Sequence, residues 1–279
     1  MSEERFRGGS RRAFTLLEVL IVIGIISVLM AILLPAAERV RHQAYIDKCA
    51  SNLRQICLAF QTYAQDNHGN YPRTPYSGNP ATYVLNEGTG TNAVDPFQSG
   101  PGAVQVNDLT APLFLLMKMQ KLSPEVMICP YNDETDFKAD NSNFTGRSNF
   151  TDEKKNLGYS FANPYPLDAV AAAGYRLSNK LSAEFAVAAD RNPGVSGKND
   201  DVYAPTLGSP WSKMKLANSP NHEFDGQNVL YGDGHVAWQK TAFCGVAQDN
   251  IYTAKKGLAP KVEASPSDAT DSILLPTDD

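Results

Sequence analysis

A long apolar run near the N-terminus limits what this chain can fold into more than any other feature. From Phe14 to Leu34 the sequence has 21 residues and a single charge, Glu18. As an α-helix this run would be about 31 Å long, which matches the roughly 30 Å hydrocarbon core of a membrane. The run therefore predicts a helix that can span a membrane, with Pro35 directly after its apolar part.

Two simpler interpretations of this run fit less well. A secretory signal should have a shorter apolar region and a small-residue cleavage site, and Leu34-Pro35-Ala36-Ala37 fits such a site badly. A plain anchor helix has the right length but leaves Glu18 unexplained. A carboxylate near the centre of a spanning helix costs roughly 2.5–3.5 kcal/mol, so Glu18 is a candidate functional residue.

The charges around the run indicate its orientation and limit the partners of the chain. Four Arg precede the run, whereas Arg39, Arg41 and Lys48 follow it, so positive charge favours a cytoplasmic N-terminus by a small margin. Without residues 1–13, which hold four Arg and two Glu, the chain has 21 basic and 28 acidic residues, a net charge of −7. An acidic chain gives no reason to expect nucleic acid as a partner.

The residues around position 13 resemble the processing site of type IV prepilins and type II secretion pseudopilins. Arg11-Arg12-Ala13 is followed by Phe14-Thr15-Leu16-Leu17-Glu18, which gives a basic leader, a small residue, a Phe and a Glu at mature position five. Pro35 falls where that family commonly kinks its long helix. The sequence departs from the family at Ala13, where Gly is usual, and this predicts slower cleavage.

The resemblance implies that a prepilin peptidase cuts between Ala13 and Phe14 on the cytoplasmic side and methylates the amino group of Phe14. The carboxylate of Glu18 can pair with the Phe14 amino group of a neighbouring subunit, which would offset the burial of both charges in an apolar bundle. We therefore expect a structural subunit that assembles with other pilin-like subunits and needs no cofactor. The expected location is the inner (cytoplasmic) membrane, crossed once, with an extracytoplasmic C-terminal domain.

Beyond Pro35 the apolar pattern keeps helical spacing and predicts an amphipathic stem over residues 36–70. Its apolar positions are Val40, Ala44, Cys49, Leu53, Ile56, Cys57, Phe60 and Ala64. Gly69 is expected to end the helix as its C-cap. With residues 1–13 as leader and 14–35 as transmembrane helix, the predicted fold is α+β, a long helix packed on a small antiparallel β-sheet.

The rest of the chain divides into a globular domain and a tail. Residues 71–256 are predicted to form the extracytoplasmic domain, with a helix within Asp108–Leu122 capped by Thr110 and a short buried strand at Ala186–Asp190. Residues 257–279 are polar, acidic and contain Pro, which predicts a disordered tail.

Four cysteines, at positions 49, 57, 129 and 244, form no C-x-x-C pair. Cys49 and Cys57 would lie about 12 Å apart along one helix, too far for a disulfide, so two of the three full pairings remain. Cys57 lies in the apolar stripe and is expected to be a core thiol. Cys49–Cys129 is the favoured single bridge. Export would permit this bridge.

The segment Asn218–Gln239 carries the sharpest signal of the C-terminal half. Asn228–Tyr231 and His235–Trp238 are predicted strands around Gly232-Asp233-Gly234, because Asp and Gly accept positive φ in a hairpin turn. The segment resembles the H-x(9)-DG motif of a pilin-like family, which would align His222 with Asp233 and Gly234, although here one extra residue separates them.

Polar side chains of the same segment are weak candidates for a metal site. They are His222, Asp225, Asp233 and His235. The favoured interpretation is that His222 and Asp233 cap turns while His235 faces solvent. A membrane-anchored binding domain that uses the His222–His235 hairpin is the competing function. An enzyme has no positive support, since the sequence has no nucleophile elbow and no Gly-rich phosphate loop.

Overall fold

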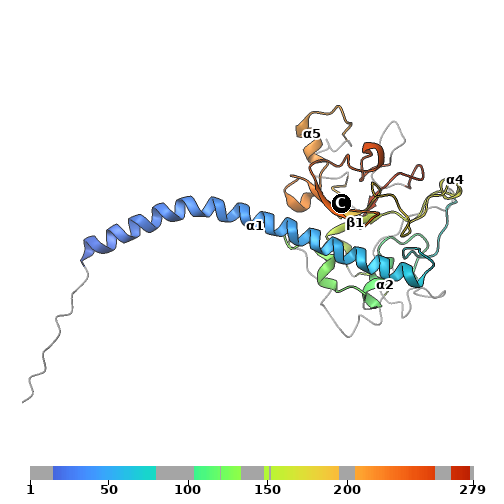
Figure 1. The fold of residues 1–279 in the computed structure, drawn as a ribbon, viewed down its shortest axis with the longest axis horizontal. Coiled ribbons are helices and arrows are strands. Elements are labelled where there is room, and N and C mark those ends of the chain that lie inside the picture. Colours follow the sequence, from blue (N-terminus) through green and yellow to red (C-terminus); the bar gives the residue numbers. More distant parts are fainter. Residues whose placement is uncertain are drawn as a thin grey trace, which may run out of the picture. The chain divides into compact units, whose positions relative to one another are not determined.

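The computed structural model describes residues 15–79, 104–119, 121–132, 148–150, 152–194, 205–254 and 265–276. By its internal contacts the chain divides into two units, Met1–Ala44 and Tyr45–Asp279. A single helix of 51 residues, α1 (Leu16–Asp66), begins in the first unit and ends in the second (Figure 1). The cleavage-site residues Ala13 and Phe14 lie outside the described residues.

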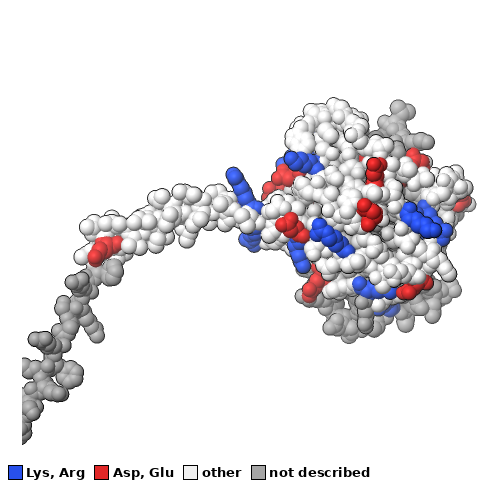
Figure 2. Space-filling model, in the orientation of Figure 1, with Lys and Arg blue, Asp and Glu red and all other residues white. Residues whose placement is uncertain are grey.

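The described part of the first unit is helical and apolar. Its large apolar side chains between Leu16 and Leu34 are each about half exposed or more, from 48% at Ile26 to 84% at Leu16. Figure 2 shows this part of the helix as an almost uncharged surface. The helix is long and apolar enough to cross a membrane. The division of this helix into a transmembrane part, residues 14–35, and a stem, residues 36–70, stays a prediction.

The second part of α1 is the central helix of the domain. Its buried residues recur at three- and four-residue intervals, which places them on one face. They are Ile46, Cys49, Ala50, Asn52, Leu53, Ile56, Cys57, Ala59, Phe60 and Ala64. The helix ends near Gly69 as predicted, because Gly69 adopts φ +81° and its N–H donates to the carbonyl of Ala64 at 2.8 Å. Val40, which was expected on the apolar face, is 70% exposed.

One antiparallel sheet of five strands packs with this helix, in the order β4-β3-β2-β1-β5. The strands are β1 (Tyr159–Ala162), β2 (Ala186–Asp190), β3 (Gln227–Tyr231), β4 (Val236–Gln239) and β5 (Leu274–Leu275). The remaining elements are α2 (Ala111–Lys118), η1 (Pro124–Met127), α3 (Glu153–Asn156), α4 (Asp168–Ala172), α5 (Trp211–Leu216), η2 (Pro220–His222) and η3 (Val246–Gln248). The predicted α+β fold class is confirmed.

The core lies where α1 meets the sheet. Phe60 of α1 stacks on Tyr71 at 5.1 Å between ring centroids and meets Phe161 of β1 edge-on at 6.1 Å. The central strand β2 is Ala-Val-Ala-Ala-Asp and is buried throughout. Full burial of each Leu, Ile or Phe side chain contributes about 1.5–3 kcal/mol, so the apolar face of α1 is a main source of the domain's stability.

Local sequence signals predicted several of these elements. The predicted hairpin is confirmed, because β3 pairs with β4 and Gly234 takes φ +92° in the turn between them. The helix within Asp108–Leu122 is confirmed as α2, but its cap differs from the prediction. Thr110 makes no side-chain cap; the carboxylate of Asp108 accepts from the backbone N–H groups of Thr110 and Ala111 at 3.0 and 2.9 Å.

The predicted disordered tail is wrong for residues 265–276. Leu274 and Leu275 form β5, which pairs with Ala162 and Phe161 of β1. Ile273, Leu274 and Leu275 are at most 1% exposed. Residues 257–279 are polar on average, and this average composition does not reveal a run of only three apolar residues. Burial of these three side chains stabilises the segment at the edge of the sheet.

Candidate functional site

The start of α1 is closed by a reciprocal pair of hydrogen bonds between Thr15 and Glu18. Glu18 Oε2 accepts from the backbone N–H of Thr15 at 2.8 Å and from its hydroxyl at 3.0 Å, while Thr15 Oγ1 accepts from the Glu18 N–H at 3.2 Å. This is a capping box, in which two orphan N–H groups of a helix end are satisfied by side chains. Glu18 therefore has a local role that does not depend on a second subunit.

Pro35 lies inside α1, which continues on both sides of it. A proline within a helix removes one backbone hydrogen bond and crowds the preceding turn. The exposed apolar run, Glu18 and Pro35 thus lie on one continuous element, as the sequence predicted.

The weak metal candidates of the C-terminal segment do not come together. Asp225 pairs with Lys215 at 2.5 Å. Asp233 accepts from the backbone N–H of His235 at 3.0 Å and lies 2.6 Å from its Nδ1. These two contacts hold the pKa of Asp233 below its usual range, the backbone bond more strongly. His235 is half exposed and stacks on Tyr231 at 4.5 Å between ring centroids, so this part of the hairpin is a stabilised turn.

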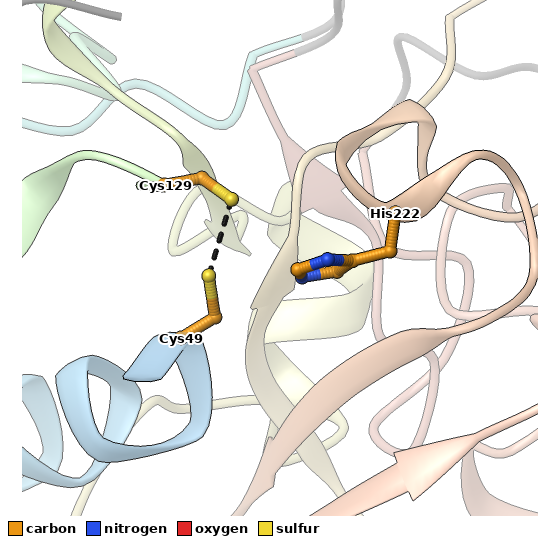
Figure 3. A group of neighbouring side chains, drawn as sticks. All are labelled: Cys49, Cys129 and His222. Carbon is orange, nitrogen blue, oxygen red and sulfur yellow. Dashed lines mark hydrogen bonds between the residues drawn. The ribbon is translucent and has the colours of Figure 1, made fainter. Parts of the chain in front are cut away.

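His222 belongs to a different group, buried between α1 and the loops that cover the sheet. Among the described residues, Cys49, Cys129 and His222 form a group whose potential ligand atoms lie within 4.8 Å of one another. Figure 3 shows the three side chains converging from α1, from the segment that follows η1, and from the end of η2. All three are 0% exposed.

The two sulfur atoms are in contact, with Cys49 Sγ and Cys129 Sγ 3.1 Å apart. Asn52, one turn after Cys49, fixes the Cys129 segment: its side-chain N–H groups donate to the carbonyl of Ile128 at 3.2 Å and to the Tyr159 hydroxyl at 3.0 Å. The structure therefore brings together the two cysteines of the predicted bridge, as unlinked thiols. The bridge itself stays a prediction.

A buried carboxylate lies next to the imidazole. His222 Nε2 is 3.5 Å from Asp190 Oδ2, and Asp190 is 0% exposed at the end of β2. The backbone N–H of Asn228 donates to the same oxygen at 2.6 Å, and its side-chain amide donates to it at 3.2 Å. Because neighbouring strands supply these bonds, the position of the carboxylate is fixed by the sheet.

Aromatic rings close the surroundings of this group. The His222 ring lies 5.7 Å from Tyr131 and 5.6 Å from Trp238, measured between centroids. Contact with Cys129, burial and the charge of Asp190 together raise the pKa of the Cys49 thiol well above its usual range. Burial likewise raises the pKa of Tyr159. This environment therefore favours the neutral form of the Cys49 thiol.

Comparison with known proteins bears on the N-terminal segment. Residues 9–34 match the prokaryotic N-terminal methylation motif. Over 87 residues the chain is 37% identical to the toxin coregulated pilin of Vibrio cholerae serotype O1. The N-terminal part of the chain is therefore similar to that of type IV pilins. The match covers 31% of this chain and 38% of that pilin, so the chain spans less than half the length of this relative. No solved structure matches the chain.

The methylation motif confirms the prepilin-type resemblance of the N-terminus and contains Ala13, Phe14 and Glu18. The sequence predicted the buried group of the domain only in part. Cys49 and Cys129 were paired and His222 was a weak candidate, but His222 was grouped with its sequence neighbours. Asp190 is the last residue of the strand predicted at Ala186–Asp190, and no local spacing connects it to the other three.

Proposed function

We propose that this chain is a subunit of a type IV pilin-like fibre, made as a prepilin, cut between Ala13 and Phe14, and methylated at Phe14. The methylation motif at residues 9–34 carries the proposal. Residues 14–35 would anchor the subunit in the cytoplasmic membrane before assembly, and residues 36–256 would lie on the extracytoplasmic side. The partners would be the prepilin peptidase and other pilin-like subunits.

The exposed apolar part of α1 supports assembly through helix contacts. Its large side chains are about half exposed or more, and Glu18 is the only charged residue between Phe14 and Ala37. Such a surface needs either lipid or neighbouring helices around it. Transfer of the helix from the membrane into a bundle of like helices keeps these side chains away from water, so assembly requires no other chemistry.

The competing binding-domain function has less support at His222 than at the exposed end of the hairpin, where His235 is half exposed. His222 is 0% exposed, so it cannot contact a ligand at the surface of the hairpin. Asp225 and Asp233 each have a partner within the chain.

Mass spectrometry of the mature N-terminus tests the proposal. The full chain is expressed with and without a prepilin peptidase, and the N-terminal peptide is sequenced. We expect N-methyl-Phe14 only in the presence of the peptidase. Ala13→Gly, which restores the usual family residue, should be cut at least as fast as the natural sequence. An intact Met1 in both hosts, or a mature start near Glu38, would refute the proposal.

A further inference from the structure

We propose that Cys49, Cys129 and His222 bind a zinc ion in the core of the globular domain, with Asp190 as the partner that orients His222. The site is independent of the fibre function, because all four residues belong to the unit Tyr45–Asp279. It also differs from the metal candidates read from the sequence, since Asp225, Asp233 and His235 take no part in it.

The donor set and its spacing fit zinc. Thiolate and imidazole ligands are the ones that select zinc in proteins, at about 2.3 Å for Zn–S and 2.0–2.1 Å for Zn–N. Tetrahedral angles at these lengths put two sulfur atoms about 3.8 Å apart. Cys49 Sγ and Cys129 Sγ are 3.1 Å apart. The two sulfur atoms would therefore have to move about 0.7 Å further apart to admit the ion.

Asp190 is a carboxylate at ion-pair distance from His222, which is the kind of neighbour that metal-bound histidines have. Such a histidine almost always donates its second ring N–H to a carboxylate, a carbonyl or water, which fixes the ring and raises its basicity. Here Asp190 Oδ2 lies 3.5 Å from Nε2, and the backbone of β3 holds that oxygen at 2.6 Å. With Nε2 turned to Asp190, Nδ1 is the nitrogen that would coordinate the ion, and an oxygen donor would complete the four ligands.

Charge gives a reason for a cation at this position. The two thiols, the carboxyl group of Asp190 and the imidazole of His222 lie together, and all four side chains are 0% exposed. Two thiolates neutralise a divalent cation, and a bound zinc ion deprotonates its thiol ligands outright. Because the ligands come from α1, the segment after η1 and η2, binding would link three distant segments of the domain.

A Cys49–Cys129 disulfide is the competing outcome, because both structures need the same two sulfur atoms. The bridge would require the sulfur atoms to approach to about 2.05 Å, and an extracytoplasmic domain could form it. It would give no ligand role to His222. The two outcomes exclude each other within one molecule and can be separated by measurement.

The first experiment uses the full-length protein in detergent. The protein is unfolded with denaturant, reductant and chelator, then refolded with or without one equivalent of Zn²⁺. We expect one zinc per chain after gel filtration, and X-ray absorption should show two sulfur ligands at about 2.3 Å with nitrogen or oxygen at about 2.0–2.1 Å. The zinc-loaded protein should melt at least about 5 °C higher. Absence of bound zinc, or a zinc spectrum without sulfur, would overturn the proposal.

Matched variants test the ligands. His222→Ala and Cys49→Ser should lose the ion, whereas His222→Cys should keep it with three sulfur ligands, a result that a packing role for His222 does not predict. Cys57→Ser and His235→Ala are controls, on the same helix and the same hairpin region, and should keep one zinc. Zinc retained by His222→Ala would overturn the site, as would a Cys49–Cys129 disulfide in protein purified from membranes without reductant. If a variant does not fold, the zinc content and spectrum of the unmodified chain still decide.

Discussion

Replacement of Glu18 by Gln separates the two roles that this residue can have. In the subunit, Glu18 closes a capping box with Thr15 through contacts of 2.8, 3.0 and 3.2 Å. In a fibre, its charge would pair with the amino group of Phe14 on a neighbouring subunit. Gln also serves at this position of a capping box, because its side-chain oxygen accepts the same N–H. Glu18→Gln therefore keeps the cap and removes the charge.

The two roles predict effects of different size. Loss of a helix cap costs about 1 kcal/mol, which is roughly a fivefold change in an equilibrium. Loss of one partner of a buried ion pair costs about 3–5 kcal/mol, since the other charge stays buried and unpaired. For the association of each subunit this is roughly two to three and a half orders of magnitude. We expect Glu18→Gln to abolish fibres nearly as completely as Glu18→Ala.

The assay compares fibre yield with membrane content in cells that make each variant. Fibres are sheared from the cells and quantified by immunoblot and electron microscopy, and the membrane fraction is quantified from the same culture. Mass spectrometry of the N-terminal peptide shows whether each variant is processed, so a cleavage defect is not mistaken for an assembly defect.

Thr15→Ala is the matched control, because it breaks the box from the other side and leaves the carboxylate in place. It should assemble within about tenfold of the natural sequence. Normal fibres from Glu18→Gln, with a loss in both Glu18→Ala and Thr15→Ala, would refute the charge-pairing argument and leave capping as the role of Glu18.

Two further predictions concern the stability of the domain, each measured by thermal or denaturant unfolding of the full chain in detergent. Leu274→Ala should lower the free energy of unfolding by about 2–4 kcal/mol, because the Leu274 side chain is fully buried. Leu207→Ala is the control and should change the free energy of unfolding little, since Leu207 is 58% exposed. If Leu274→Ala changed it as little as Leu207→Ala, the packing of residues 265–276 on the sheet would be refuted. Gly226→Ala should destabilise the domain by more than about 1 kcal/mol, because φ of Gly226 is +156° and the new Cβ would lie 2.5 Å from the carbonyl oxygen of Gln239. Gly208→Ala, with open space around it, is the control, and a neutral Gly226→Ala would contradict the close approach of Gln239 to Gly226.

Elements with a local signal could be predicted from the sequence. The first half of α1 follows from an unbroken apolar run, and its second half from apolar residues spaced three or four apart. The hairpin follows from an Asp-Gly turn between two apolar strands. Thr15 and Glu18 also have the spacing of a capping box, so the local role of Glu18 has a sequence signal as well. The cost of burying a carboxylate in a membrane indicates only the second role, in assembly.

Features that depend on tertiary contact could not be predicted. Cys49 and Cys129 are 80 residues apart, and His222 and Asp190 come from other segments of the chain, so no window of sequence contains the buried group. The strand at Leu274 was missed for a related reason. Two residues are too few for a periodic pattern, and their partner strand β1 lies more than 100 residues earlier.

The short strand β5 also affects how copies of this chain behave when they are held close together. The edge of a sheet offers unpaired N–H and C=O groups to any other strand, and this is a common route to aggregation. At Phe161 and Ala162 that edge of β1 is occupied by the chain's own C-terminal segment. The edge then consists of the two-residue strand β5, and such a short edge strand offers few groups through which subunits at high local concentration could join sheet to sheet. A chain shortened before residue 265 would expose this edge, and we expect it to be lost to insoluble aggregates even when its N-terminus is processed normally.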